Sequence, residues 1–456
     1  MWRQNRYVSA IRLASRLIVF LAAVLVGNVH GQTGASKETA RQLHSSTTPT
    51  YYRDVQPILR QHCTVCHHAD GIAPMSFETF DAARRYAYII RTVTQAKTMP
   101  PQFAIPLVGK VVNDPSLTPA QISTLADWAN LNAPEGDAHE APPVPGAVAP
   151  RSIPKPDFVV KMPEPVPIAA TGNLEYVYQI VPTHFTEDRW IQMAELLPSM
   201  RANVLQIMVV IRRPGSPWLR HAPVGKPFTS AVVAGIEDHR WADDDILLVY
   251  TSGGSAQEFP VTMGKSIPAG ADLVFRVQYT TNGVAGSERS SVGFVFCKQV
   301  PSKRVITLAL ENTRFTIPPN TPDYRIEAQG VLRRDVLLLG FFPLLHLRGK
   351  QFEYDVIPAP KATRGDVNPQ METLLRVKYD LRWQTSYPLS EPRFLETGAE
   401  LRAVAWYDNS PNNPNNPDPN ASVNRGDQPR DEVLRGFFDV AVPATIGEHK
   451  ILVRHH

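Results

Sequence analysis

The pentapeptide Cys63-Thr-Val-Cys66-His67 constrains this chain more than any other feature of its sequence. Cys-x-x-Cys-His is the attachment pattern of a c-type haem. On a helix the two cysteines lie one turn apart, so both can form thioether bonds to one edge of the porphyrin. His67 then supplies the proximal iron ligand. The pattern predicts one haem c, and a chance match or a thiol-exchange pair are the alternatives.

The residues around this motif have the periodicity of short helices. Apolar residues precede the motif on one face of a first helix, and a second apolar stripe starts at Phe80. A third helix begins with a capping box, in which Thr118 and Gln121 flank Pro119 at the first helical position. We therefore expect residues 49–137 to form a small all-α cytochrome c domain.

A c-type haem needs a second axial ligand or an open iron position. Met99, in Thr98-Met-Pro-Pro101, follows the second helix and is the best candidate, because prolines would make its loop rigid. Met75, after Pro74, is the competing residue. A methionine sulfur would suit electron transfer, whereas an open iron would suit ligand binding.

The N-terminus reads as a secretion signal, which we place at residues 1–31. Four arginines precede the apolar run Leu17–Val26, and Val29-His-Gly31 provides a small-residue cleavage site. The run is short for a membrane span, although an uncleaved anchor remains an alternative. Residues 32–48 are polar and are expected to form a flexible leader. We expect an exported protein, periplasmic in a bacterium, with no membrane span after cleavage.

Charge and cysteine content narrow the class of protein further. The net charge is +4, and residues 1–31 contain four arginines and no acidic residue, so the remaining chain is neutral. No nucleic-acid surface is therefore implied.

The chain has three cysteines. If haem attachment consumes Cys63 and Cys66, Cys297 is left alone in an apolar strand-like run, as a small buried hydrophobic residue.

The sequence beyond residue 137 has the pattern of a β protein. A proline-rich linker is expected at residues 138–156. Strands are predicted at residues 204–211, 246–250, 271–280, 291–297, 305–310, 336–339 and 401–406. No helical pattern alternates with them, which favours antiparallel sandwiches. We divide this region into two jelly-roll-like β-sandwiches, 157–310 and 311–456, so that the predicted fold is multidomain.

Both halves of the chain resemble known families. Residues 50–137 are similar to bacterial cytochrome c domains. The region from about residue 157 to the end resembles the copper type II, ascorbate-dependent monooxygenases, and the whole chain resembles exported bacterial fusions of the two. The motifs that carry the second resemblance are Phe185-Thr-Glu-Asp-Arg-Trp190, Ile267-Pro-Ala-Gly-Ala-Asp-Leu-Val274, Tyr279-Thr-Thr-Asn-Gly283, His346-Leu-Arg-Gly-Lys350, Tyr407-Asp-Asn-Ser410, Asn415-Asn-Pro-Asp-Pro419 and Gly426-Asp-Gln428.

The resemblance implies one copper ion in each sandwich. The first would be bound by an adjacent His-His pair and a later histidine. In this chain Leu205 and Gln206 stand at the pair, and Gln278 stands at the later histidine. By its parity in the strand, Gln278 still projects where the ligand would.

The second copper would be bound by His-x-His and a methionine. Here Leu344 and His346 stand at the two histidine positions, and Val433 stands at the methionine position. Five of the six implied ligands are therefore replaced by residues that hold copper poorly or not at all. His346 is either a vestige of the site or a hydrogen-bonded core residue.

These observations predict an exported one-electron carrier with one haem c, without copper and without catalytic residues. The double sandwich would serve docking or structure, and a redox partner, for example a copper-bearing paralogue, would exchange electrons with the haem. An active copper- and haem-dependent monooxygenase is the first alternative, with His184, His221 and His239 as a differently placed site. A haem-based sensor with an open sixth position is the second.

Overall fold

The computed structural model describes residues 48–69, 71, 73, 75–101, 104–105, 111–112, 115–142, 153–172, 176–229, 245–251, 256–360, 370–381, 384–426, 428, 430–446 and 451–455. The predicted secretion signal, nearly all of the leader and His239 lie outside these residues. Within the described residues, no helix has the length and apolar character needed to cross a membrane.

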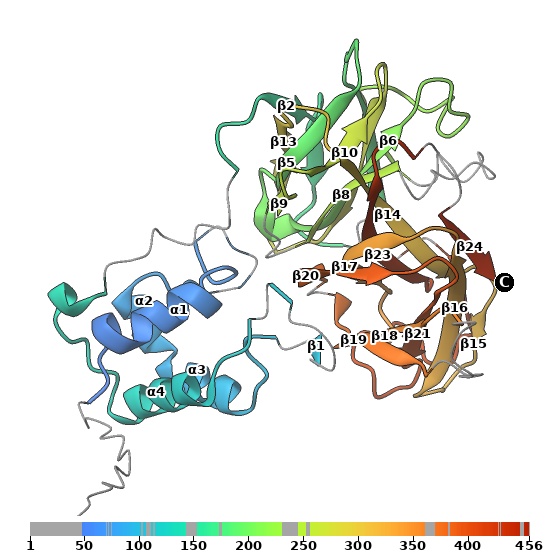
Figure 1. The fold of residues 1–456 in the computed structure, drawn as a ribbon. Helices are drawn as coiled ribbons and strands as arrows, with labels where there is room; N and C mark the ends of the chain where they lie inside the picture. Colours follow the sequence, from blue (N-terminus) through green and yellow to red (C-terminus); the bar gives the residue numbers. More distant parts are fainter. Residues whose placement is uncertain are drawn as a thin grey trace, which may run out of the picture. The chain divides into compact units, whose positions relative to one another are not determined.

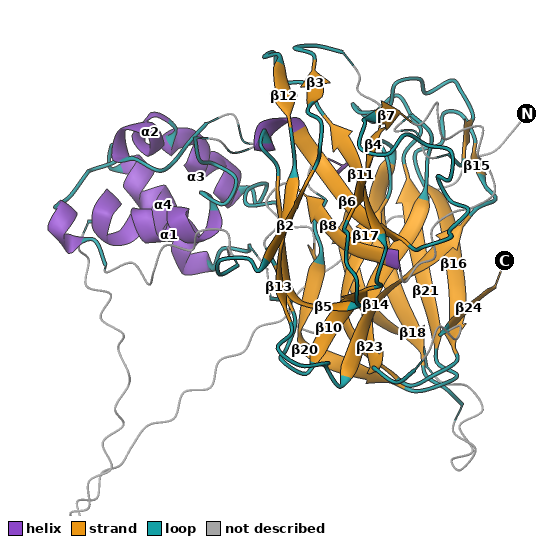
Figure 2. Ribbon diagram, turned by 90° about the horizontal axis from the view of Figure 1, so that it is seen from above, coloured by secondary structure: helices purple, strands orange, loops and turns teal. Residues whose placement is uncertain are grey.

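Apart from the 3-10 turn η3 (Arg201–Asn203), the helical elements of the described chain lie in its N-terminal part (Figure 2). They are the π-helical turn η1 (Tyr51–Val55), α1 (Gln56–His62), α2 (Phe80–Arg85), α3 (Ala87–Gln95), α4 (Pro119–Asn130) and the short 3-10 turn η2 (Ala138–Glu140). The predicted capping box is present, because the Thr118 side chain accepts from the Gln121 amide and Gln121 returns a bond to the Thr118 amide. The predicted second helix is divided at Tyr86, whose backbone leaves the helical conformation.

One apolar cluster joins these helices. Tyr51, Leu59, Leu125 and Trp128 are buried in it, and the Trp128 indole donates to the Pro134 carbonyl at 3.0 Å. The region is not purely helical, however. The connection between α3 and α4 contains the strand β1 (Ala104–Ile105), which pairs antiparallel with β19 (Glu372–Lys378) of the β region. The expectation of an all-α region is therefore corrected by this two-residue strand.

The remainder of the described chain consists of strands in three large sheets (Figure 1). The first contains, in spatial order, β7 (Phe228–Thr229), β4 (Tyr176–Pro182), β11 (Asp272–Tyr279), β6 (Val204–Arg212) and β8 (Ile246–Thr251). The second contains β2 (Phe158–Lys161), β13 (Ser291–Phe296), β5 (Arg189–Leu197), β10 (Met263–Ile267), β14 (Lys303–Asn312), β23 (Leu434–Pro443), β17 (Val336–Leu344) and β20 (Tyr387–Leu395), with β9 (Gln257–Glu258) paired to β5.

The third large sheet contains β1, β19, β18 (Gly349–Ile357), β21 (Glu400–Tyr407), β16 (Tyr324–Leu332) and β24 (Leu452–His455). Two small ladders join β3 (Val166–Ile168) to β12 (Gly286–Glu288) and β15 (Thr316–Ile317) to β22 (Val423–Asn424). Six of the seven predicted strands coincide with an observed strand to within two residues at each end. The seventh, predicted at 336–339, starts with β17 but ends five residues too early. The pairing is antiparallel throughout the described ladders except between β10 and β14, which confirms a mainly antiparallel β architecture.

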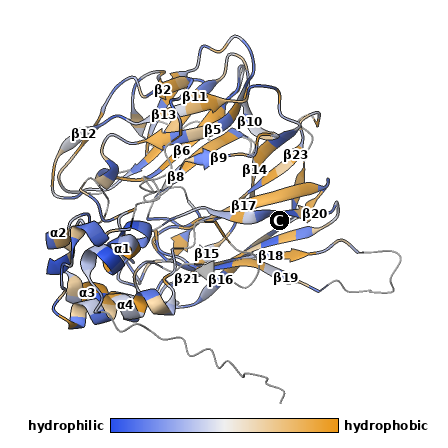
Figure 3. Ribbon diagram, turned by 60° about the vertical axis from the view of Figure 1, so that its left-hand side comes forward, coloured by the Kyte–Doolittle hydropathy of each residue, from blue (hydrophilic) through white to orange (hydrophobic). Residues whose placement is uncertain are grey.

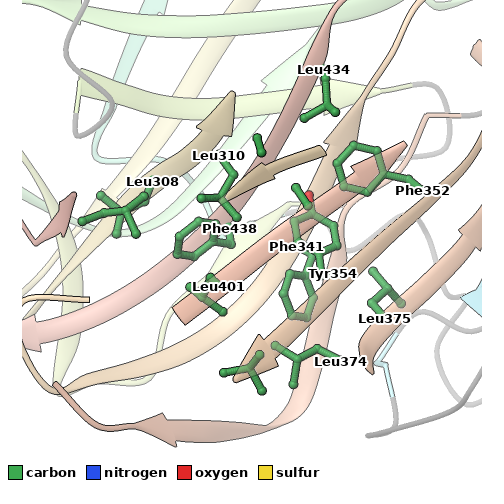
Figure 4. Packing of buried hydrophobic residues seen from close by; sticks show 14 of the residues in the cluster. Leu308, Leu310, Phe341, Phe352, Tyr354, Leu374, Leu375, Leu401, Leu434 and Phe438 are labelled. Carbon is green, nitrogen blue, oxygen red and sulfur yellow. The ribbon is translucent and has the colours of Figure 1, made fainter. Parts of the chain in front are cut away.

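Alternation along the strands produces the sandwich cores (Figure 3). In β11, Leu273, Phe275 and Val277 point into a first core shared with β5 and β13. In the C-terminal half, Phe341 and Phe438 of the second sheet face Tyr354 of the third sheet in another core, shown in Figure 4. We call these two packed pairs of sheets the first and second sandwich.

The two sandwiches share one continuous sheet. The predicted boundary near residue 310 falls inside β14, which pairs with β10 on one side and β23 on the other. At this junction the buried Lys265 ammonium donates to Thr307 Oγ1 at 2.8 Å and lies 3.4 Å from an Asp439 carboxylate oxygen. A third apolar cluster fills the interface between the sandwiches with residues of β4, β6, β11, β17 and β23.

Candidate functional site

The Cys-x-x-Cys-His motif directly follows α1. The Cys63 amide donates to the Leu59 carbonyl at 2.8 Å and ends the helix. The Cys63 carbonyl then accepts from the amides of Cys66 at 3.1 Å and His67 at 2.9 Å. The cysteines therefore lie in the turns after the helix and not on the helix itself, which corrects the prediction. The bonds from residue 63 to residues 66 and 67 still give the spacing of one helical turn.

Both cysteines have free thiols. Burial raises the pKa of the Cys63 thiol to about 12 and that of Cys66 to about 11. The thiols are therefore protonated at neutral pH. Thiol-exchange proteins instead lower the pKa of a cysteine to obtain a reactive thiolate. The surroundings of this pair differ from those that thiol exchange requires.

The His67 imidazole is held by hydrogen bonding and by stacking. Its Nδ1 donates to the Met75 carbonyl at 3.0 Å, which leaves Nε2 with its lone pair. The Phe77 ring stacks on the imidazole with centroids 4.4 Å apart and planes 16° from parallel. Burial lowers the pKa of His67, so the ring is neutral at pH 7. An oriented neutral imidazole with a bonded Nδ1 is the usual state of a metal-binding histidine.

The loop from His68 to Phe77 folds back over the motif. The Ala73 amide donates to the Cys66 carbonyl at 3.3 Å, and the Phe77 amide donates to the His67 carbonyl at 2.9 Å. Gly71 permits this approach, since a Cβ there would lie 2.1 Å from the Cys66 carbonyl oxygen. The main chain of the loop therefore positions the histidine.

The two candidate methionines lie in different surroundings. The Met75 carbonyl is on the Nδ1 side of His67, opposite the nitrogen that would bind iron. Its side chain packs against the helical core. Met99 follows α3, as predicted, and its amide donates to the Val93 carbonyl at 3.2 Å. The role of its sulfur as an iron ligand stays a prediction.

The histidine that precedes the motif has a structural role. His62 Nδ1 donates to the Pro115 carbonyl at 3.0 Å, and its Nε2 lies 3.1 Å from the Gln121 side-chain amide. The ring thereby connects the end of α1 to the start of α4.

At the first implied copper position, amide and phenol side chains lie side by side on three neighbouring strands. Gln206 on β6 and Tyr176 on β4 are the register partners of Gln278 on β11. All three are buried, and Gln206 donates to Gln384 Oε1 at 2.7 Å. The described residues supply no hydrogen-bond partner to Oε1 of Gln206 or of Gln278. Leu205 has the opposite parity and is half-buried. Amide oxygens are hard donors, so this row does not fit copper.

The second implied copper position is filled by apolar packing. Leu344 and Val433 are buried in the cluster between the sandwiches, together with Tyr176 of the first sandwich. His346 is 1% exposed, and its Nδ1 donates to the Asp431 carbonyl at 3.1 Å. Its ring centroid lies 6.5 Å from that of Tyr176. The structure thus brings both degenerate positions to one interface, which the sequence analysis did not predict.

A buried carboxyl group lies next to this interface. Glu432 is fully buried and accepts from the His346 amide at 3.0 Å and the Arg348 amide at 2.7 Å. Burial nevertheless raises the pKa of Glu432 to about 8. The carboxyl group therefore connects the turn that follows β17 to the segment before β23, and its raised pKa favours the protonated form near neutral pH.

Several residues at these positions were missed by the sequence analysis. Tyr176 and Gln384 come from distant segments, and no motif marks either of them. Phe77 follows the haem motif by ten residues in a loop without periodicity. Met75 was considered as an iron ligand through its sulfur, whereas in the structure its carbonyl accepts a hydrogen bond from His67. Only Tyr176 could have been found from the sequence. The side chains of β4 alternate between the first core and the interface, as those of β11 do, and Tyr176 has the interface parity.

Two of the other histidines considered for a metal site lie on the surface. His184 and His221 are both exposed, and His184 has a positive φ of 58°. His239 lies outside the described residues. Among the described residues, no group of three or more His, Cys, Asp or Glu side chains could hold a metal ion.

Comparisons with known proteins leave the family open. No family model matches the sequence, and a search of curated proteins finds no match. Among solved structures, capsid proteins of infectious bursal disease virus are similar only in part. The Gx strain structure has a TM-score of 0.19 at 8% identity, covering 66% of this chain and 76% of the viral chain. The VP2 subviral particle has a TM-score of 0.19 at 10% identity, covering 65% and 75%. Likenesses this low identify neither fold nor function.

Proposed function

We propose that this protein is an exported one-electron carrier with one covalent haem c. Cys63 and Cys66 would hold the group through thioether bonds, and His67 would be its proximal ligand. The group would supply a reversible one-electron iron couple. The observation that carries this proposal is the hydrogen bond from His67 Nδ1 to the Met75 carbonyl, which directs Nε2 away from the loop.

Met99 is the proposed distal ligand. Met75 is disfavoured because its main chain is bonded to His67 on the side opposite Nε2. A residue behind the proximal histidine cannot also present its sulfur to the other face of the iron. Met99 belongs to a different segment, after α3, and is free of this constraint.

The double sandwich would serve as a docking or structural module without copper. The six implied ligand positions contain one imidazole, two amides and three aliphatic side chains. Two of the aliphatic residues, Leu344 and Val433, belong to a packed apolar cluster. A reactive copper needs three or four nitrogen or sulfur donors in a fixed geometry. The redox partner, for which a copper-bearing paralogue is the proposed candidate, would bring any oxygen chemistry.

The test is production of the full chain in a host that attaches haem c, followed by denaturation. The wild type should retain haem through denaturation and give a haemochrome spectrum typical of two thioether bonds. Cys63→Ala/Cys66→Ala should lose the haem on denaturation, and Cys297→Ala is the matched control that should retain it. A wild type without covalent haem would refute the proposal.

Metal analysis of the same preparation separates the alternatives. We expect one iron per chain and no stoichiometric copper. Nearly two copper ions per chain, together with oxygen-dependent hydroxylation, would support the monooxygenase. Carbon monoxide binding to the reduced wild type would instead support a sensor with an open sixth position.

A further inference from the structure

The Phe77 ring lies against the His67 imidazole in a defined stacked geometry. The centroids are 4.4 Å apart and the planes are 16° from parallel. Phe77 is itself well fixed, because it is 7% exposed and its amide donates to the His67 carbonyl at 2.9 Å. The Phe77 ring also lies near the Tyr86 ring, with centroids 6.0 Å apart and planes tilted by 59°. The Phe77 ring is therefore held in a fixed position against one face of the imidazole.

The stacking and the Nδ1 hydrogen bond restrict different motions of the histidine. The bond to the Met75 carbonyl fixes the direction in which Nδ1 points. By itself it still allows the ring to turn about the Cβ–Cγ bond over a limited range, because acceptance by a carbonyl is broad in angle. A parallel aromatic ring in contact with the imidazole face prevents that rotation. Together the two contacts determine both the direction of Nε2 and the plane of the ring.

We propose that Phe77 is a positioning residue that fixes the plane of the proximal His67 imidazole relative to the haem. This inference rests on the proposed function. The imidazole plane determines which iron d orbital overlaps with the ligand π system. It therefore sets the anisotropy of the ferric haem, a property that general packing in the helical core does not control.

The experiment compares Phe77→Leu, Phe77→Tyr and Phe80→Leu in the full-length haem-loaded chain. Phe77→Leu removes the aromatic ring and keeps an apolar side chain, whereas Phe77→Tyr keeps the stacked ring. Phe80 packs in the same helical core, with Tyr51 as its ring neighbour, and is the matched control. The readouts are the ferric electron paramagnetic resonance spectrum and the spread of the haem methyl proton shifts.

Phe77→Leu should shift the largest g value and change the spread of the methyl shifts. Phe77→Tyr should reproduce the wild-type values, and so should Phe80→Leu. If Phe77→Leu fails to yield haem-loaded protein, Phe77→Met gives the same comparison with an unbranched side chain that adapts better to the site. Unchanged spectra in the non-aromatic variant, or equal shifts in Phe80→Leu, would overturn the inference.

Failure of this inference is distinguishable from failure of the proposed function. Covalent haem in the wild type, measured after denaturation, supports the carrier whatever the Phe77 variants show. A wild type that carries covalent haem, with spectra insensitive to Phe77, removes only the positioning role. A wild type without covalent haem removes both.

Discussion

His67 and His346 make the same hydrogen bond in different surroundings. Each donates from Nδ1 to a backbone carbonyl, of Met75 at 3.0 Å and of Asp431 at 3.1 Å. Such a bond orients an imidazole for metal binding through Nε2. Beside His67 are two free thiols at the spacing of haem attachment, whereas the implied partners of His346 are Leu344 and Val433. An oriented imidazole therefore does not form a metal site unless other ligand side chains lie beside it.

The two regions also differ in what holds them together. The loop around His67 is organised by main-chain hydrogen bonds, and the thiols of Cys63 and Cys66 are free. The interface around His346 is held by apolar packing between sheets and by the buried Glu432 carboxyl group. Substitutions should consequently change redox properties at the first region and stability at the second.

The pair His67→Ala and His346→Ala tests this contrast most directly. His67→Ala should lose the low-spin haem spectrum, because the proximal ligand is removed. His346→Ala should keep that spectrum and lower the free energy of unfolding by about 1–3 kcal/mol, through loss of a buried hydrogen-bonded group. Absorption spectroscopy and chemical denaturation measure the two effects. A haem spectrum altered by His346→Ala would contradict the separation of the regions.

Met99→Ala and Met75→Ala sharpen the assignment of the sixth ligand. Met99→Ala should abolish the absorption band of the sulfur–iron bond and lower the reduction potential, because a thioether ligand raises it. Met75→Ala should retain the band, since its carbonyl stays in place. Loss of the band in Met75→Ala alone would reverse the assignment.

Leu344→Ala and Leu205→Ala compare two degenerate copper positions that differ in burial. Leu344 is fully buried between the sandwiches, so truncation should cost about 2–5 kcal/mol of unfolding free energy. Leu205 is half-buried, and the same change should cost roughly 1 kcal/mol or less. Equal losses in denaturant titrations would mean that Leu344 does not fill the interface.

Glu432→Gln tests the buried carboxyl group through the pH dependence of stability. Burial raises the folded-state pKa of Glu432 to about 8 from the ordinary 4.5. Between these values the unfolded chain releases its proton first, so the free energy of unfolding falls as pH rises. The slope contributed is at most about 1.4 kcal/mol per pH unit. The contribution is complete below pH 4.5 and lost above pH 8.

The Glu432→Gln variant should therefore have a flatter stability profile between these pH values. Asp355, whose pKa burial raises to about 6, titrates in both proteins and cancels in the difference. Parallel profiles for wild type and variant, measured by denaturation at several pH values, would show that Glu432 is already ionised in the folded state.

Local patterns predicted much of the secondary structure. The capping box at Thr118 and the alternation in β11 depend on neighbouring residues, so they can be recognised in the sequence. The break in the helix at Tyr86 could not be recognised, because the helical spacing of apolar residues continues through that position in the sequence. The strand β1 is only two residues long, and it pairs with β19 more than 250 residues later. Such a pairing leaves no periodic signal.

The candidate sites divide in the same way. The Cys-x-x-Cys-His motif carries its chemistry in five consecutive residues, and the parity of Gln278 follows from the period of a strand. Three other features depend on contacts that the motif itself does not contain: the hydrogen bond from His67 to the Met75 carbonyl, the stacking of Phe77 on His67, and the proximity of Tyr176 to His346. Residue identities therefore specify which donors the chain possesses. Long-range packing determines which of these donors are held in a fixed orientation, which are buried under apolar side chains, and which lie beside further donors.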